Sequence, residues 1–310
     1  MSAGPAAGAR RPLRSALLGA LERALAALVG GLAWPRAQAL GRGIGRLGWA
    51  LAARDRRRTL EHLAVAFPEL PASERLHLAR ASFRHFGAML TECLWMRRRD
   101  AAEVLRRVAL EGWPEVERAR GEGRPVLIVT GHCGNWELLA AALNARGLGM
   151  AVVARELEDP GLQSALLGLR SRFGTRTIVR GTRSAARDLL RTVRSGGALG
   201  MLIDQDTRVE GVWVPFFGRP AWTPVGAAEI ALRLSAAVLP TFIERRPDGS
   251  HLAIVHPALE LPADPLAATA AMTARIEEQI RRVPEQWVWL HRRWRRQPEA
   301  GGGARPEPES

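Results

Sequence analysis

The spacing of hydrophobic and polar positions changes part-way along the chain. Residues 55–118 carry apolar positions at helical spacing, interrupted by Pro68, Pro71 and Pro114, and contain no strand pattern. From Arg124 onward, short apolar runs rich in β-branched residues alternate with helical stretches, which predicts an α/β domain with a mixed, largely parallel sheet flanked by helices. The predicted strands are residues 125–130, 150–154, 177–179, 198–203, 237–243 and 251–256, and the last predicted helix is 265–282.

The first part of the chain has a different pattern. Apolar side chains between residues 17 and 32 fall on one arc of a helical wheel, which predicts an amphipathic helix. A weaker segment, 40–53, and a cluster of arginines within 54–58 follow. The uncharged stretch 24–35 is shorter than the roughly 20 residues of a membrane-spanning helix. We therefore expect a helical segment that lies on, or dips into, an anionic membrane surface; a helical pair that only covers the core is the alternative.

These patterns divide the chain into four segments. Residues 1–54 are expected to form N-terminal membrane-anchoring helices, residues 55–118 a helical subdomain and residues 119–296 the α/β domain. Residues 297–310, rich in Gly, Pro and Glu, are expected to be a disordered tail.

Composition and charge narrow the classes of function. With 47% hydrophobic and 25% charged residues, the chain has the composition of an ordinary globular protein. Its net charge of +14 rests on arginine, since no lysine occurs, and favours an anionic partner such as a phosphate group or an acidic membrane. No nucleic-acid partner is expected, because the sequence lacks helix-turn-helix, zinc-finger and RNA-binding signatures. The two cysteines, Cys93 and Cys133, fit a reducing compartment, and no His/Cys spacing predicts a metal site.

The segment with the clearest chemistry follows the strand predicted to end at Thr130. It reads Gly-His-Cys-Gly-Asn-Trp-Glu over residues 131–137, and a turn must separate His132 from the next helix. Asn135 is a suitable N-cap, which places Glu137 in the first helical turn, where a carboxylate is favoured. His132 with Glu137 as its orienting partner would be a general base at the edge where open α/β sheets bind ligands. The alternative is a buried, hydrogen-bonded His132 and a Glu137 that only caps the helix.

Several blocks of the sequence resemble one family. His132-x4-Glu137 after a strand is similar to the catalytic motif of glycerolipid-type acyltransferases, and the whole pattern resembles their lipid A branch, the late acyltransferases that add lauroyl or myristoyl chains. The resemblance covers residues 55–296. The other blocks that carry it are Arg155, Arg170 and Arg172, the acidic Asp204-Gln205-Asp206, residues 214–221 leading to Thr223 and Gly226, and residues 284–294.

The resemblance implies transfer of a fatty acyl group from an acyl carrier protein thioester to a hydroxyl of a lipid A precursor or related membrane glycolipid, with no cofactor and no metal. His132 would be the general base, supported by Glu137. The enzyme would lie at the inner membrane with its catalytic domain on the cytoplasmic side. Alternatives are another glycolipid acceptor, such as a phosphatidylinositol mannoside, or a non-catalytic basic protein that binds a membrane or nucleic acid. The candidate substrate-binding residues are Arg155, Arg170, Arg172, Asp204, Asp206, Gly134 and Asn135.

Some of these residues have a second interpretation. Asp204 and Asp206 point the same way at a strand end, and either bind sugar hydroxyls or a cation, or cap a helix or pair with Arg208. The oxyanion formed during acyl transfer needs donors, for which the N–H groups of residues 134–136 and the arginines Arg155 and Arg170 are the candidates. The basic face of a helix near 183–194 either docks an acidic carrier protein or is simply solvated. The tryptophans of 284–294 fit a membrane interface or the core.

Overall fold

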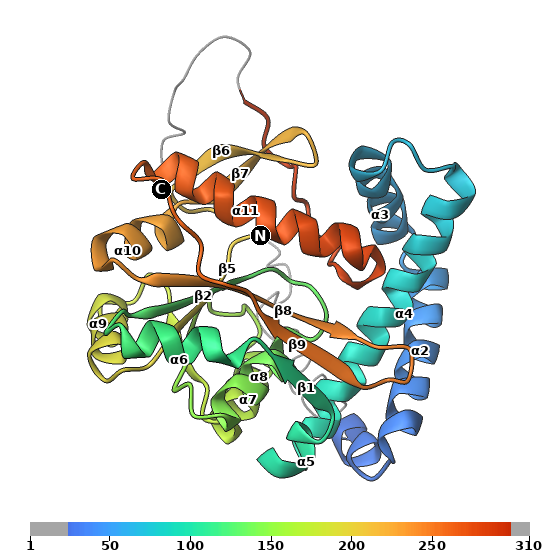
Figure 1. The fold of residues 1–310 in the computed structure, drawn as a ribbon. Coiled ribbons are helices and arrows are strands. Elements are labelled where there is room, and N and C mark those ends of the chain that lie inside the picture. Colours follow the sequence, from blue (N-terminus) through green and yellow to red (C-terminus); the bar gives the residue numbers. More distant parts are fainter. Residues whose placement is uncertain (1–23, 299–310) are drawn as a thin grey trace, which may run out of the picture.

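A central sheet of seven strands organises the computed structural model, which describes residues 24–298 (Figure 1). Five of these strands run parallel, the next one is antiparallel to its neighbour in that group, and the edge strand runs parallel to that one. The sheet is therefore mixed and largely parallel, as predicted. In order across the sheet the strands are β1 (Val108–Glu111), β9 (His251–Val255), β8 (Ala237–Arg245), β2 (Val126–Thr130), β5 (Leu199–Leu202), β3 (Ala151–Ala154) and β4 (Arg176–Val179).

All six predicted strands are present, and three further strands were not predicted. β1 lies in the segment expected to be helical, where its four residues at the sheet edge are too short to show a pattern. β6 (Gly211–Phe216) and β7 (Arg219–Pro224) form an antiparallel hairpin outside the main sheet. Pro215 and Pro220 face each other in this hairpin, and proline normally argues against a strand.

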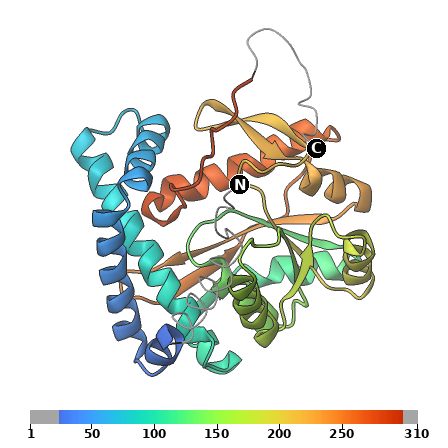
Figure 2. The same cartoon turned by 180° about the vertical axis from the view of Figure 1, so that it is seen from behind.

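Helices cover both faces of the sheet (Figures 1 and 2). Each face has its own cluster of buried apolar side chains, one extending into the N-terminal helices and the other beneath the hairpin. The last predicted helix, 265–282, has the same bounds in the structure. One face carries α6 (Trp113–Gly121), α7 (Trp136–Ala145) and α8 (Pro160–Arg172); the other carries α9 (Ala185–Arg194), α10 (Gly226–Leu234) and α11 (Pro265–Arg282).

A pair of long helices stands at one side of the molecule, blue and cyan in Figure 1. Their backbones approach closely at glycines: a Cβ atom at Gly45 would collide with the carbonyl oxygen of Phe83. Most of the segment 40–53 therefore belongs to a helix that ends at Leu51 and packs on its neighbour. Of the amphipathic helix expected at 17–32, residues 17–23 lie outside the described residues, as do residues 299–310 of the tail. The N-terminal helices are α2 (Trp34–Leu51), α3 (Ala53–Ala66), α4 (Ala72–Met96) and the short α5 (Ala101–Leu105).

Candidate active site

His132 lies just beyond the carboxyl end of β2, beside an aspartate from the neighbouring strand. β2 and β5 pair in parallel, so Asp204, two residues after β5, reaches the loop that carries His132. The distance between His132 Nδ1 and Asp204 Oδ1 is 2.7 Å. The backbone N–H of His132 and the indole N–H of Trp287 both donate to Asp204 Oδ2, each at 2.7 Å. Asp204 thus holds the ring, the backbone of His132 and the C-terminal segment together.

The environment of Asp204 keeps its carboxyl group ionised. Asp204 is fully buried, and burial alone would raise its pKa. The charge of His132, together with the hydrogen bonds from His132 and Trp287, outweighs this effect and lowers the pKa of Asp204 to about 2. A carboxylate at Nδ1 fixes that nitrogen as the protonated one, which leaves Nε2 to accept a proton. The side chain of His132 is 21% exposed, so a substrate can reach it.

Glu137 does not contact His132 in this way. Instead, Arg170 of α8 donates to both of its oxygens, from Nε to Oε2 at 2.9 Å and from Nη2 to Oε1 at 2.7 Å. The expectation that Glu137 orients His132 is therefore wrong, and Asp204 takes that place. The predicted helix start is correct, but the first turn of α7 directs Glu137 towards α8. Sequence spacing between two residues says nothing about a third residue that tertiary packing brings closer.

The turn after His132 has a fixed shape. Gly134 has a φ of 62°, in the left-handed region, and a Cβ atom there would collide with the carbonyl oxygen of Ile243. Its N–H donates to Gln286 O at 2.9 Å. Asn135 is the N-cap of α7, as predicted: its Oδ1 accepts from the N–H of Leu138 at 3.0 Å.

Gly134 and Asn135 were also expected to contact substrate, and in the structure several of their polar groups have partners within the protein. The N–H of Gly134 is occupied by Gln286. The side chain of Asn135 is fully buried, with Oδ1 used in the helix cap and Nδ2 donating to Glu92 Oε2 at 2.9 Å. Both residues shape the turn, and neither offers these groups to a ligand.

The remaining candidate site residues have other partners. Arg170 is the partner of Glu137 described above. Arg155 is exposed, 3.9 Å from the exposed Glu158. Arg172 donates to the carbonyl oxygen of Arg99 at 2.8 Å. Asp206 is buried and pairs with Arg295 at 2.9 Å, and with Arg296 at 3.4 Å, so the expected alternatives of a helix cap or an Arg208 partner are both wrong.

The C-terminal segment adds groups whose position the sequence did not reveal. Trp287 is fully buried against Asp204, and Trp289 is also fully buried, so these two tryptophans belong to the core. His291 lies close enough to Asp204 and His132 for their charges to affect its pKa. Burial lowers the pKa of His291 to about 4, with Asp204 opposing this shift and His132 adding to it. The sequence marked this segment by its resemblance to a family motif, but only the fold brings Trp287 against Asp204.

Other kinds of chemistry have less support. Cys133 is buried, and burial followed by the charge of Asp204 raises the pKa of its thiol, which disfavours a thiolate nucleophile; its expected packing role is confirmed. Within residues 24–298, no three His, Cys, Asp or Glu side chains gather as metal ligands would. At this site, the imidazole of His132 contacts the buried carboxylate of Asp204.

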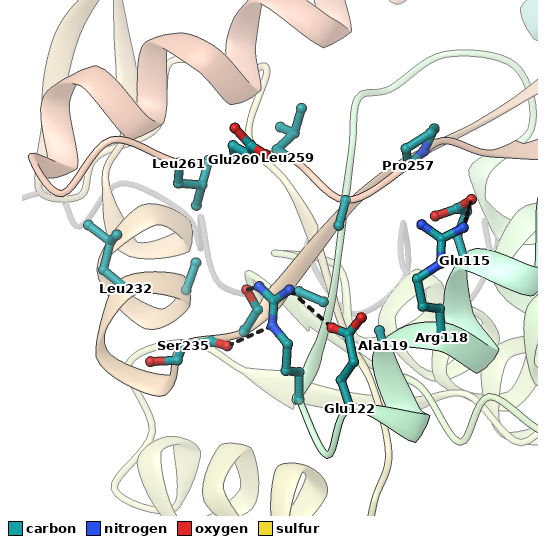
Figure 3. Close-up of a pocket in the computed structure, with 15 residues that line it drawn as sticks. Glu115, Arg118, Ala119, Glu122, Leu232, Ser235, Pro257, Leu259, Glu260 and Leu261 are labelled. Atoms are coloured by element: carbon teal, nitrogen blue, oxygen red, sulfur yellow. Dashed lines mark hydrogen bonds and ion pairs between the residues drawn. The ribbon is translucent and has the colours of Figure 1, made fainter.

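A separate hollow lies at the opposite edge of the sheet (Figure 3). It has a volume of about 470 Å³ and is bordered by Ala236 and Ala237 at the amino end of β8. Its arginines are paired with neighbouring acids: Arg118 lies 2.9 Å from Glu115, and Arg124 lies 3.5 Å from Glu122. β2 and β8 are parallel, so the amino end of β8 lies at the opposite end of the strands from His132, which follows the carboxyl end of β2. This hollow is therefore not part of the site.

Comparison with known proteins shows the family of this chain. The profile of the family described as bacterial lipid A biosynthesis acyltransferase matches residues 13–296. The chain belongs to this family, and it is an enzyme that transfers acyl groups.

The chain also matches individual curated relatives. It is 29% identical to the lipid A biosynthesis lauroyltransferase of Escherichia coli K12, over 88% of this chain and 89% of that protein. It is 27% identical to the palmitoleoyltransferase of the same organism, over 84% and 85%. It is 29% identical to a phosphatidylinositol mannoside acyltransferase of Mycobacterium tuberculosis, over 76% and 75%.

Proposed function

We propose that this chain transfers a fatty acyl group from an acyl carrier protein thioester to a hydroxyl group of a lipid A precursor or a related membrane glycolipid. The observation that carries the proposal is the His132–Asp204 pair, in which a buried carboxylate holds Nδ1 of a partly exposed imidazole at 2.7 Å. Family membership supports acyl transfer as the reaction of this pair.

In the proposed mechanism, His132 Nε2 removes the proton of the acceptor hydroxyl as its oxygen attacks the thioester carbonyl carbon. Asp204 stabilises the imidazolium that forms, because its charge lies directly against Nδ1. The tetrahedral intermediate then collapses: the ester C–O bond remains, the C–S bond breaks, and the proton on Nε2 passes to the departing thiolate. His132 returns to its neutral form, and no covalent enzyme intermediate is needed.

The start of α7 is the proposed site for the oxyanion. The first N–H groups of a helix have no partner within the helix and carry partial positive charge. In α7 these are the N–H groups of Trp136 and the next residue, and the ring of Trp136 packs edge-on against His132 with centroids 4.8 Å apart. Arg170 is less suitable, because Glu137 occupies its guanidinium.

Arginines at the carboxyl ends of β3 and β4 are the proposed binding site for acceptor phosphates. The register of these strands places Arg155 next to Arg180, and the N–H of Arg180 donates to Ala154 O at 2.9 Å. Partial burial and the charge of Arg155 lower the pKa of Arg180. Two neighbouring cations favour a bound anion, and guanidinium groups match phosphate geometry.

The proposal of a carrier-protein donor is based on a different surface, the basic face of α9. Arg187, Arg191 and Arg194 lie on α9, near the exposed Leu190. Asp188 pairs with Arg191 at 2.9 Å, and the face as a whole remains basic. A basic face with an apolar centre suits an acidic carrier protein.

We place the enzyme at the inner membrane with its catalytic domain on the cytoplasmic side. Within residues 24–298, no helix is long and apolar enough to cross a membrane. The outward face of α2 instead exposes Leu40, Leu47 and Leu51, the last 74% exposed. Residues 33–54 contain four arginines and no acidic residue, a combination that suits an anionic lipid surface.

A phosphatidylinositol mannoside is the second candidate acceptor. This candidate rests on the 29% identity to the mycobacterial enzyme named for that lipid, which equals the identity to the lauroyltransferase. Both acceptors present a hydroxyl group on a glycolipid, so the same His132 chemistry applies to either.

The decisive experiment is mass spectrometry of lipid products. The full chain and its His132→Ala variant are incubated with carrier protein bearing decanoyl to hexadecanoyl chains, and with either an underacylated lipid A precursor or a phosphatidylinositol mannoside. We expect the variant to lose roughly 10² to 10⁴-fold in rate while remaining folded. Transfer to one acceptor identifies it, whereas an active His132→Ala variant contradicts the mechanism.

Membrane attachment is tested separately by co-sedimentation with vesicles of phosphatidylcholine, with and without phosphatidylglycerol. We expect the full chain to bind the anionic vesicles, and a Leu40→Gln/Leu47→Gln/Leu51→Gln variant to bind them more weakly. The control is Leu162→Gln/Leu190→Gln/Leu266→Gln, which changes three exposed leucines on other helices. Equal binding by both variants would mean that α2 is not the lipid-binding surface.

A further inference from the structure

A buried charged group lies behind the turn that carries His132. Glu92 of α4 is fully buried, and Arg245 at the end of β8 donates to both of its oxygens, from Nε and from Nη2, each at 2.9 Å. Asn135 donates to Glu92 Oε2 at 2.9 Å. Gln38 of α2 donates to Oε1 at 2.7 Å. One carboxylate thus joins the N-terminal helices, the sheet and the cap of α7.

His85 links Arg245 to Gly134, the residue of the turn before Asn135. His85 Nδ1 accepts from Arg245 Nη1 at 2.5 Å, and His85 Nε2 donates to the carbonyl oxygen of Gly134 at 3.2 Å. Burial, and then the charge of Arg245, lowers the pKa of His85 well below its ordinary value. A neutral His85 fits this role, since it accepts at one ring nitrogen and donates at the other.

Arg245 also reaches the turn through its backbone. Its N–H donates to Gln286 Oε1 at 2.8 Å, and its carbonyl oxygen accepts from Gln286 Nε2 at 3.0 Å. The carbonyl oxygen of Gln286 in turn accepts from the N–H of Gly134. Gly134 and Asn135, which are two and three residues after His132, are therefore held on several sides.

The cost of burying these charges indicates a role beyond stability. A buried ion pair gains little over well-packed apolar side chains, because its attraction is offset by desolvation. Its geometry is nevertheless specific, since a two-pronged guanidinium–carboxylate contact fixes both groups in direction as well as distance. A misplacement of about 1 Å in a catalytic group reduces rates by roughly 100-fold.

We propose that Glu92 and Arg245, acting with His85, are positioning residues that fix the Gly134–Asn135 turn and through it the alignment of His132 with Asp204. The role of these residues in the rate rests on the proposed acyl transfer. Their effect on the shape of the turn does not, and it can be measured without substrate.

The kinetic test compares Glu92→Gln with Gln38→Met. Both variants remove an interaction at the same carboxylate, but Gln38 does not touch the turn. We expect Glu92→Gln to lower kcat by roughly 10- to 100-fold with KM within about twofold, and Gln38→Met to leave kcat unchanged. In the His132→Ala background, Glu92→Gln should have no further effect on the residual rate, because its contribution passes through His132.

The structural test measures amide hydrogen exchange over residues 126–138. In each variant these rates are compared with the exchange rate that global unfolding alone would give. The N–H groups of His132, Gly134 and Leu138 are hydrogen-bonded in the turn, and we expect them to exchange faster in Glu92→Gln than in Gln38→Met. Asn135→Ser serves as a second variant if Glu92→Gln does not fold. Serine keeps a good N-cap but is too short to reach Glu92.

The outcomes separate the two proposals. Equal kinetics and equal exchange in Glu92→Gln and Gln38→Met would overturn the positioning role, and so would an additive loss in the His132→Ala background. A wild-type chain that transfers no acyl group would overturn the proposed function, and the exchange measurement would still decide whether Glu92 fixes the turn.

Discussion

Asp204 and Glu137 are both buried carboxylates near the start of α7, and their partners differ. Asp204 holds His132, whose charge changes during the proposed reaction, whereas Glu137 holds Arg170, whose charge is permanent. Only an interaction that strengthens in the transition state accelerates the chemical step. In the proposed mechanism the contact of Asp204 meets this condition, and the Glu137–Arg170 pair, as it stands, contributes to structure.

The difference shows how a motif can contain the candidate base without the carboxylate that contacts it. Glu137 is five residues from His132 in the sequence, and Asp204 is seventy-two residues away. In space Asp204 is the carboxylate that contacts His132, because the parallel neighbours β2 and β5 have their carboxyl ends at the same edge of the sheet.

The largest expected effect is that of Asp204→Asn. An amide in this place cannot stabilise the imidazolium, and it can direct an N–H at Nδ1, which favours the wrong tautomer. We expect kcat to fall roughly 10³-fold, or about 4 kcal/mol in activation free energy, with little change in KM. Steady-state kinetics on the folded variant measure it, and a loss below tenfold would contradict the role of Asp204.

The second effect is that of Glu137→Gln on stability. The variant leaves the guanidinium of Arg170 buried without a counter-charge, so we expect the free energy of unfolding to fall by about 3 kcal/mol. The double variant Glu137→Gln/Arg170→Met should recover most of it. Urea denaturation measures both, with Asp188→Asn at an exposed ion pair as the control, expected to change less than about 1 kcal/mol.

Activity of the same variants sharpens the comparison. Glu137→Gln should lose less than about tenfold in kcat once its folded fraction is taken into account, far less than Asp204→Asn. A stable Glu137→Gln variant as slow as Asp204→Asn would instead make Glu137 part of the chemistry.

The smallest effect is on the dependence of stability on pH. The pKa of His291 is about 4 in the folded chain and about 6.5 when unfolded, so the unfolded state binds more protons between these values. Stability should therefore fall by about 2 kcal/mol as the pH drops from about 6.5 to 4. The lowered pKa of Asp204 acts only below about pH 4.

Urea denaturation at pH 7 and pH 5, on wild type and His291→Gln, isolates this contribution, because the other histidines with lowered pKa remain in both chains. A variant that loses as much stability as wild type over this interval would show that His291 is not buried as a neutral group.

Local patterns predicted much of the fold. The strands around β2 and β8, and the bounds of α11, follow from runs of apolar residues and from Asp264 and Pro265 at the helix start. The hairpin of β6 and β7 could not be predicted in this way, because its prolines contradict strand patterns and its stability comes from packing on α11 and the C-terminal tryptophans.

By itself, the sequence determined the α/β class and the cap Asn135, and it singled out His132 as the candidate base, because each depends on residues close together in the chain. Only the tertiary structure decided that Asp204 and Trp287 complete the site, that Glu137 pairs with Arg170, and that Glu92 lies behind the turn. These contacts join residues from separate strands and helices. Their existence depends on sheet register and core packing, which no local spacing encodes.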